Sequence, residues 1–109
     1  QNHLLRPKLY DAYHEITNLS NPHGTKRIYS VVGYICEADT LAYDRQLNEV
    51  REGDVLAIHN AGAYAISMSS NYNSRFRPAE VLIYNGKAHL IRKRETFEDL
   101  MKTQVSVEI

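Results

Sequence analysis

The stretch AEVLIYNGKAHLIRKRE, residues 79–95, contains the strongest local folding signal in the chain. Asn85 and Gly86 join two runs of strand-forming residues, and an Asn-Gly pair favours the positive φ angles of a type I′ turn. Turns of this kind connect neighbouring antiparallel strands. The stretch therefore predicts a β-hairpin with its tip at Asn85-Gly86.

Outward from the hairpin, three more segments predict strands. Residues 12–20 alternate loosely between apolar and polar side chains and then meet an Asn-Pro-His-Gly turn. The β-branched and aromatic run of residues 27–36 predicts a buried central strand over its whole length. A Glu-Gly-Asp turn at residues 52–54 precedes a short apolar run over residues 55–58.

The remaining segments predict short helices. Residues 63–76 are rich in Ser and Asn without a clear period, which suits a helical turn that leads into a loop. Thr96 and Asp99 have the spacing of a capping box at the start of a short helix. Five or six short strands with one or two short helices predict a mainly β fold, a small antiparallel, Greek-key-like barrel or sandwich.

Composition limits the classes of function. The 109 residues are 43% hydrophobic and 24% charged, which predicts one compact domain with a single core. Thirteen basic residues balance thirteen acidic ones, so we expect no nucleic-acid partner. The apolar runs are far shorter than the roughly 20 residues that span a bilayer, so we expect no membrane partner. A single cysteine and no secretory leader predict a cytoplasmic location.

The single cysteine, Cys36, is followed by Glu37 and Asp39. A cysteine at a strand end is usually a small hydrophobic side chain. The neighbouring carboxylates disfavour a thiolate, so the alternative is a proton donor rather than a nucleophile. The five histidines form no closely spaced pair and there is no second cysteine, so we expect no metal site.

Two further segments carry groups that could bind a polar ligand. Arg6 offers a planar fork for a carboxylate or a phosphate, and Tyr10, four residues on, can add a hydroxyl donor. The alternative is an arginine whose stem covers apolar surface at a strand edge. Residues 62–75 are dense in Ser, Asn and Tyr, which suits either a hydrated loop or a segment that faces a polar ligand.

The order of these motifs resembles the C-terminal part of the diaminopimelate decarboxylases, which are fold-type III pyridoxal-phosphate enzymes. The matching stretches are LRPKLYDAYH (5–14), GYICEADT (33–40), GDVLAIHNAGAYAISMSSNYNSR (53–75) and RPAEVLIYNGKAHLIRKRETFEDL (77–100). The resemblance implies conversion of meso-2,6-diaminopimelate to L-lysine and CO2 by a two-domain protein. Residues 1–109 would be its C-terminal β-barrel domain, and a (β/α)8 barrel that binds most of the pyridoxal 5′-phosphate would lie upstream. The chain begins without an initiator methionine, so we expect it to be part of a longer polypeptide.

The same resemblance implies roles for individual residues. Arg6 and Tyr10 would bind the distal carboxylate of the substrate, and Glu37 would bind its distal ammonium. Cys36 would be the catalytic acid that protonates the carbanion left when CO2 departs. Tyr64 would contact both substrate and cofactor, near the cofactor phosphate. Cys36 and Glu37 would reach the active site of the other subunit, which implies a homodimer with shared sites.

The match departs from the family at one loop, where many members have Cys-Glu-Ser-Gly-Asp and this chain has Cys-Glu-Ala-Asp-Thr. Two alternatives stay open. One is the β domain of a related ornithine, arginine or carboxynorspermidine decarboxylase, although Glu37 with Arg6 and Tyr10 favours diaminopimelate. The other is a non-catalytic dimerisation module, which would have no need of this set of residues.

Overall fold

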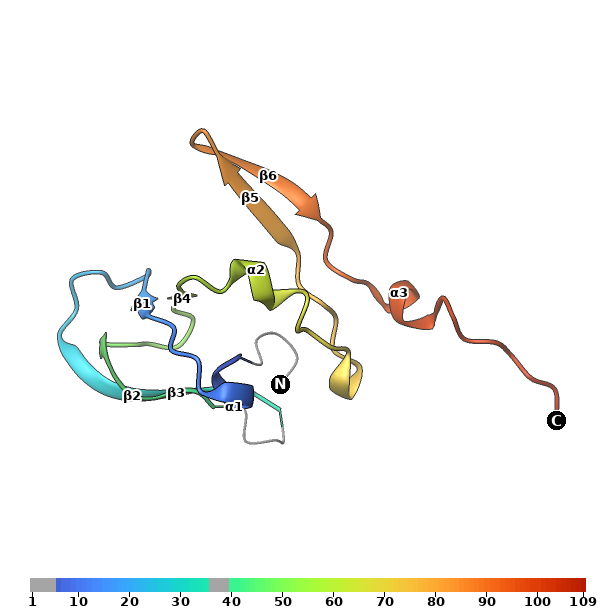
Figure 1. Cartoon of the computed structure of the whole chain (residues 1–109), viewed down its shortest axis with the longest axis horizontal. Helices are drawn as coiled ribbons and strands as arrows, with labels where there is room; N and C mark the ends of the chain where they lie inside the picture. Colours follow the sequence, from blue (N-terminus) through green and yellow to red (C-terminus); the bar gives the residue numbers. More distant parts are fainter. Residues whose placement is uncertain (1–5, 36–39) are drawn as a thin grey trace.

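The computed structural model describes residues 6–35 and 40–109. In these ranges the chain consists of short strands joined by turns, with one-turn helices between them (Figure 1). The elements, in chain order, are α1 (Arg6–Tyr10), β1 (Ile16–Asn18), β2 (Lys26–Val32), β3 (Thr40–Asn48), β4 (Leu56–Ile58), α2 (Gly62–Ala65), the 3-10 turn η1 (Tyr72–Ser74), β5 (Glu80–Tyr84), β6 (Lys87–Arg92) and α3 (Phe97–Met101).

The strands pair antiparallel in three separate two-stranded sheets. β1 pairs with β4, β2 pairs with β3, and β5 pairs with β6. The mainly β class with a few short helices is therefore confirmed. Across residues 6–35 and 40–109 the three sheets do not close into a barrel.

The predicted hairpin is present as β5–β6. Tyr84 pairs with Lys87, and the two residues between them have φ angles of 48° at Asn85 and 71° at Gly86. Both angles are positive, as a type I′ turn requires. The turns predicted at residues 21–24 and 52–54 are also formed, since Gly24 N donates to Asn21 O and Gly53 has a φ of 86°.

The expectation of a buried strand over residues 27–36 is wrong in two respects. β2 ends at Val32, which pairs with Thr40, the first residue of β3, and residues 33–35 are not in a strand. Cys36 itself lies outside the described residues. The strand is also largely exposed, with Ile28 at 62% and Val32 at 61%. Apolar composition predicted a strand, but only Tyr29 and Val31 of β2 pack against the core, and the other side chains of this strand are exposed.

β3, the longest strand, is not evident from the sequence pattern. Its register against β2 shifts twice: Tyr29 pairs with Arg45 while Val31 pairs with Ala42, and Val32 then pairs with Thr40. Tyr43 and Asp44 thus lie opposite the single residue Ser30, as in a β-bulge, and Asp44 has a φ of 48°. Each bulge interrupts the alternation of inward and outward side chains, so the period of two that identifies a strand is lost.

A small core lies where β1 and β4 meet β2 and β3. Ile16, Ala42 and Leu47 are buried together, with β4 side chains packed against them. The chain is more extended than a compact domain of its length. The chain exposes 8339 Å², against roughly 6,200 Å² for a compact protein of this mass. Its radius of gyration is 16.7 Å, against about 13 Å.

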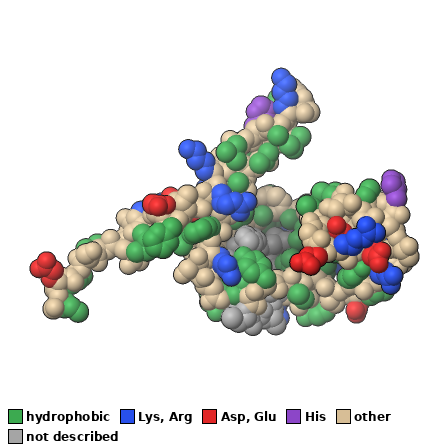
Figure 2. Space-filling model, turned by 180° about the vertical axis from the view of Figure 1, so that it is seen from behind, with side chains coloured by type: hydrophobic (Ala, Val, Ile, Leu, Met, Phe, Trp, Pro, Cys, Tyr) green, Lys and Arg blue, Asp and Glu red, His purple; other side chains and the backbone are tan. Residues whose placement is uncertain are grey.

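The excess surface belongs to the C-terminal half. Hairpin β5–β6 projects from the compact lobe, and the segment after α3 extends away from it (Figure 1). Figure 2 shows hydrophobic side chains along both projections. On the hairpin, Leu82, Ile83 and Leu90 are 48%, 67% and 62% exposed.

Asn18 links the turn at residues 20–21 to the segment of residues 49–54 through hydrogen bonds. The side chain is buried, and its amide nitrogen donates to the Glu49 carbonyl at 3.0 Å and to Asp54 Oδ2 at 2.8 Å. Its amide oxygen accepts from the backbone N–H groups of Ser20 and Asn21. The hydrogen bond from Asn18 holds the pKa of Asp54 below its ordinary value, with help from the Arg51 N–H.

Candidate functional site

Helix α1 places Arg6 and Tyr10 side by side. Residues four apart share one face of a helix, and Pro7 near its start supplies the φ angle that a first helical turn needs. Arg6 Nε donates a hydrogen bond of 2.7 Å to the Tyr10 hydroxyl. The expected alternative of an arginine on a strand edge is therefore wrong, because Arg6 begins a helix.

Tyr64, from a distant part of the sequence, completes this group. The Arg6 guanidinium lies over the Tyr64 ring, with Cζ 4.0 Å from the ring centroid. Such a contact is attractive because the aromatic face is negative. We call Arg6, Tyr10 and Tyr64 the Arg6 cluster. The structure brings together three of the five residues that the sequence singles out.

The Arg6 cluster suits an anionic ligand. The bond to Tyr10 uses one of the five N–H donors of the guanidinium, and the planar fork can bind a carboxylate through two parallel hydrogen bonds. Tyr10 and Tyr64 are 52% and 43% exposed, so both remain accessible from solvent. The Tyr10 oxygen accepts from Arg6, which leaves its own O–H to donate.

Helix α2 orients Tyr64. It begins after Ala61, which is buried and whose carbonyl accepts hydrogen bonds from the N–H groups of Tyr64 and Ala65. The short helical turn that residues 63–76 predict is confirmed as α2 and η1. Small residues at 61–63 let the chain turn tightly from β4 into α2.

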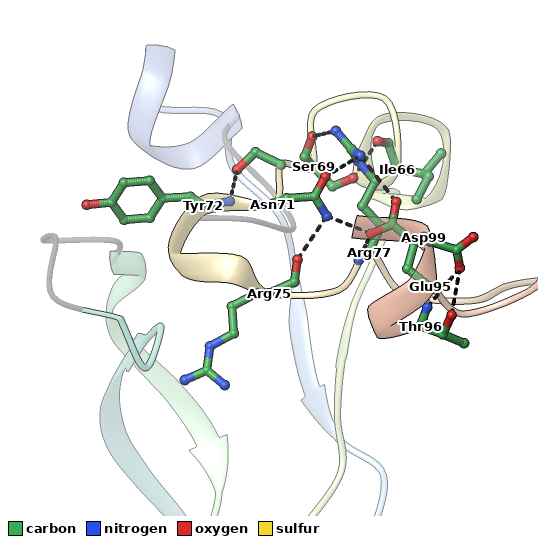
Figure 3. Close-up of polar contacts among 10 residues, drawn as sticks. Ile66, Ser69, Asn71, Tyr72, Arg75, Arg77, Glu95, Thr96 and Asp99 are labelled. Carbon is green, nitrogen blue, oxygen red and sulfur yellow. Dashed lines mark hydrogen bonds and ion pairs between the residues drawn. The ribbon is translucent and has the colours of Figure 1, made fainter. Parts of the chain in front are cut away.

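A polar network fixes the segment that follows α2 (Figure 3). Glu95 accepts hydrogen bonds from the Arg77 backbone N–H at 2.7 Å and from Asn71 Nδ2 at 2.6 Å, and its carboxylate pairs with the Arg77 guanidinium at 3.3 Å. The Arg77 N–H is the main reason that the pKa of Glu95 lies below its ordinary value. Asn71 Nδ2 also donates to the Arg75 carbonyl.

Arg75 projects from this network in a different direction. Figure 3 shows its side chain pointing away from Arg77 and Glu95. The guanidinium lies over the ring of Tyr34, 4.9 Å from its centroid. Tyr34 precedes Cys36 by two residues in the sequence. Cys36, Glu37 and Asp39 themselves lie outside the described residues.

Hollows also open elsewhere on the surface of the described residues. One of about 300 Å³ lies between β1 and β3, and one of about 500 Å³ lies between the Asn71 network and α3. Neither is lined by a member of the Arg6 cluster. No group of three or more potential metal ligands occurs among residues 6–35 and 40–109. A search of the same residues finds no helix long and apolar enough to cross a membrane.

Comparison with known proteins identifies the family. Residues 1–62 match the family model described as the pyridoxal-dependent decarboxylase C-terminal sheet domain. The chain belongs to this family. The matched segment of this decarboxylase sheet domain includes Arg6, Tyr10, Cys36 and Glu37, and it ends just before Tyr64.

Individual relatives extend the similarity over nearly the whole chain. A diaminopimelate decarboxylase from Methanothermobacter thermautotrophicus is 54% identical over 105 residues, which are 94% of this chain and 24% of that protein. One from Aquifex aeolicus is 45% identical over 107 residues, 97% of this chain and 26% of that protein. The chain thus spans about a quarter of the length of these relatives.

A solved structure shows the same fold. The crystal structure of diaminopimelate decarboxylase from M. jannaschii in co-complex with L-lysine superposes with a TM-score of 0.86 at 46% identity. The match covers 96% of this chain and 24% of that one. The arrangement of three open sheets with a projecting hairpin is therefore similar to part of a larger protein.

Sequence reasoning did not single out His14, which is buried and hydrogen-bonded to the turn before α2. The visible signal was its place two positions before Ile16 in a strand-like segment, where both side chains would face the same side. A histidine at an inward position of a strand must find a polar partner. The partner, the carbonyl of His59, is 45 residues away and cannot be read from local sequence.

Proposed function

We propose that residues 1–109 form the C-terminal sheet domain of a diaminopimelate decarboxylase, which converts meso-2,6-diaminopimelate to L-lysine and CO2 in the cytoplasm. Relatives with this name at 45% and 54% identity support the proposal. The single observation that carries it is the Arg6 cluster, in which Arg6 bonds Tyr10 and stacks on Tyr64. A dimerisation module has no reason to hold such a set of exposed donors together.

In this proposal Arg6 and Tyr10 bind the distal carboxylate of the substrate. The guanidinium and the carboxylate form a bidentate pair, and the Tyr10 O–H donates to the same group. The bond between Arg6 Nε and Tyr10 holds both donors in one orientation before the substrate arrives. A substrate without that carboxylate leaves the cluster unpaired, which is a strong basis for discrimination.

The family implies pyridoxal phosphate, and the residues present fit it. Tyr64 offers a phenol donor beside a cationic guanidinium, a combination suited to phosphate or carboxylate oxygens. When bound, the cofactor supplies an electron sink for the carbanion left by decarboxylation. Tyr64 would orient the cofactor near its phosphate and contact the substrate, while most cofactor contacts would come from the upstream part of the protein.

Cys36 and Glu37 complete the proposed site. Glu37 would pair with the distal ammonium of the substrate, and Cys36 would donate the proton to the α-carbon after CO2 leaves. Both residues would act in the active site of a second subunit, so the enzyme would be a homodimer. The Cys-Glu pair at positions 36–37 supports this assignment, and the Ala-Asp-Thr that follows is where the chain departs from the family.

Turnover of the full-length protein tests the proposal. Purified protein loaded with pyridoxal phosphate should release CO2 from meso-diaminopimelate, and Cys36→Ala should lower kcat far more than it changes KM. Preference for ornithine, arginine or carboxynorspermidine would instead support a related decarboxylase. Wild-type turnover by the Cys36→Ala variant would remove Cys36 as the proton donor.

A further inference from the structure

We infer that His14 is a positioning residue, which fixes the turn of residues 59–61 and thereby places Tyr64 in the Arg6 cluster. The inference rests on the proposed function, because it assigns a role in the same site. His14 would act through the backbone of this turn and would not itself touch substrate or cofactor.

The His14 ring is held by one specific hydrogen bond. The side chain is 4% exposed, and its Nδ1 lies 2.8 Å from the carbonyl oxygen of His59. Because a carbonyl oxygen only accepts, Nδ1 carries a hydrogen and donates it. Nε2 is buried and has no hydrogen-bond partner within the described residues. Among the described residues, the His14 ring therefore makes its hydrogen bond through Nδ1 alone.

The turn of residues 59–61, which accepts this hydrogen bond, contains a residue with a positive φ angle. Asn60 has a φ of 54°, in the left-handed region, which costs energy for a residue with a side chain and which asparagine adopts more readily than most. Such a conformation persists where neighbouring contacts over-determine it. Ala61 follows directly, and its carbonyl accepts from Tyr64 N at 3.1 Å. A change of backbone angle at Asn60 would therefore rotate α2 and move the Tyr64 ring off Arg6.

The backbone around His14 is also held by hydrogen bonds. The carbonyl of His14 accepts a 2.9 Å hydrogen bond from Arg45 Nη1 of β3. His59 N donates to the Glu15 carbonyl at 2.8 Å, and His59 Nε2 lies 2.9 Å from Thr17 Oγ1. These hydrogen bonds set the distance between residues 14–17 and the turn at residues 59–61. The His14 side chain adds the bond closest to Asn60, on the His59 carbonyl.

Two substitutions in the full-length protein separate the hydrogen bond from the shape of the ring. His14→Asn keeps an amide N–H near the place of Nδ1 and removes the ring, whereas His14→Phe keeps the ring shape without any nitrogen. For each variant we would measure kcat and KM for meso-diaminopimelate. Hydrogen exchange would be measured for the peptide of residues 59–68, with the peptide of residues 81–92 from β5–β6 as internal control.

The phenylalanine variant is expected to lose about 10- to 100-fold in kcat/KM, as a misplaced binding group does. Its exchange should rise over residues 59–68 and stay constant over residues 81–92. The asparagine variant should stay within about threefold of wild type in kcat/KM and match its exchange. The reverse order of the two variants, or equal effects of both, would overturn the positioning role.

Tyr64→Ala distinguishes this inference from the proposed function. If that variant keeps wild-type kcat/KM, the proposed site is wrong. If it is impaired while His14→Phe is not, the role of His14 alone fails. The double variant should be no worse than Tyr64→Ala, because a residue that acts through Tyr64 has no additive effect. A fully additive loss would overturn the inference.

Discussion

At the scale of single residues, the chain holds its loops with buried or half-buried polar side chains that each serve several partners. Asn18 satisfies two backbone N–H groups, one carbonyl and one carboxylate. An amide that uses its donors and its acceptor in this way is a crosslink between turns. Its loss leaves several groups unpaired at once.

Asn18→Ala should therefore lower the stability of the full-length protein by about 2 to 3 kcal/mol. Asn48→Ala is the matched control, because its amide makes one described hydrogen bond, to the Asn21 carbonyl. We expect the control to lose about 1 kcal/mol. Urea denaturation measures both values, and equal losses would contradict the crosslinking role of Asn18.

Glu95 should make stability depend on pH in acid. Its pKa is lowered in the folded chain, chiefly by the Arg77 N–H. The folded state therefore binds this proton less readily than the unfolded state, and the stabilisation is complete above the ordinary pKa. It is lost as the pH falls through the lowered value. The Tm difference between wild type and Glu95→Gln should be largest near neutral pH, shrink as the pH falls below the ordinary glutamate pKa, and disappear once the pH is below the lowered pKa.

The control for Glu95 is Glu108→Gln, at an exposed position of the C-terminal segment for which no such contact is described. This control should follow wild type over the whole range. A Tm difference for Glu95→Gln that stays constant from neutral pH into acid would show that the charge of Glu95 contributes nothing.

The bond between Arg6 and Tyr10 leads to a prediction about substrate recognition. Arg6→Lys keeps the positive charge but loses both the planar fork and the Nε bond to Tyr10. We expect kcat/KM for meso-diaminopimelate to fall by about 10- to 100-fold, mostly through KM. Tyr10→Phe should lose less, since it removes one hydroxyl. Steady-state kinetics measures both, and unchanged KM for Arg6→Lys would remove Arg6 from substrate recognition.

At the scale of elements, the hairpin turn and α2 offer a matched pair of glycines. Gly86 has a φ of 71° with no atom near the position of an added Cβ, so Gly86→Ala meets strain without a clash. Gly62, in α2, has neither a positive φ nor a neighbouring atom within 4 Å. Gly86→Ala should lower stability by about 1 to 2 kcal/mol, and Gly62→Ala should leave it unchanged or raise it by about 0.5 kcal/mol.

Thermal denaturation of the two full-length variants measures this difference. The comparison is informative because both substitutions add the same methyl group to open space. Equal effects would show that the left-handed angle at Gly86 is not what maintains the β5–β6 turn.

At the scale of the whole molecule, the exposed hairpin indicates that the chain is incomplete as a folding unit. Leu82, Ile83, Leu90 and Ile91 are all largely exposed on two adjacent strands. Extended apolar strands with free edges pair with other chains. We expect the 109-residue chain, expressed alone, to self-associate at micromolar concentration, as light scattering would show.

Replacing Ile83 and Leu90 by threonine keeps strand propensity while lowering hydrophobicity, and it should reduce this association. The same pair of substitutions in the full-length protein should instead be destabilising, because there the hairpin would be covered. A monomeric wild-type chain would contradict the prediction.

Local sequence was sufficient for features that depend on neighbouring residues. The Asn-Gly turn, the Gly53 turn and the helix after Thr96 follow from backbone preferences that act within a few residues, and all three are present. The spacing of Arg6 and Tyr10 likewise placed two donors together. The family resemblance, confirmed for the chain, added Tyr64 to the same group.

Only the tertiary structure decided the rest, because it depends on pairing between distant segments. The bulges of β3 hide its alternation, and β2 ends where that partner begins, so neither could be read from composition. The contact of Tyr64 with Arg6 and the bond of His14 to the His59 carbonyl join residues more than forty positions apart. The sequence by itself determined which chemical groups the site can use. Long-range antiparallel pairing determined that they meet, because backbone hydrogen bonds between strands fix distances that local preferences do not.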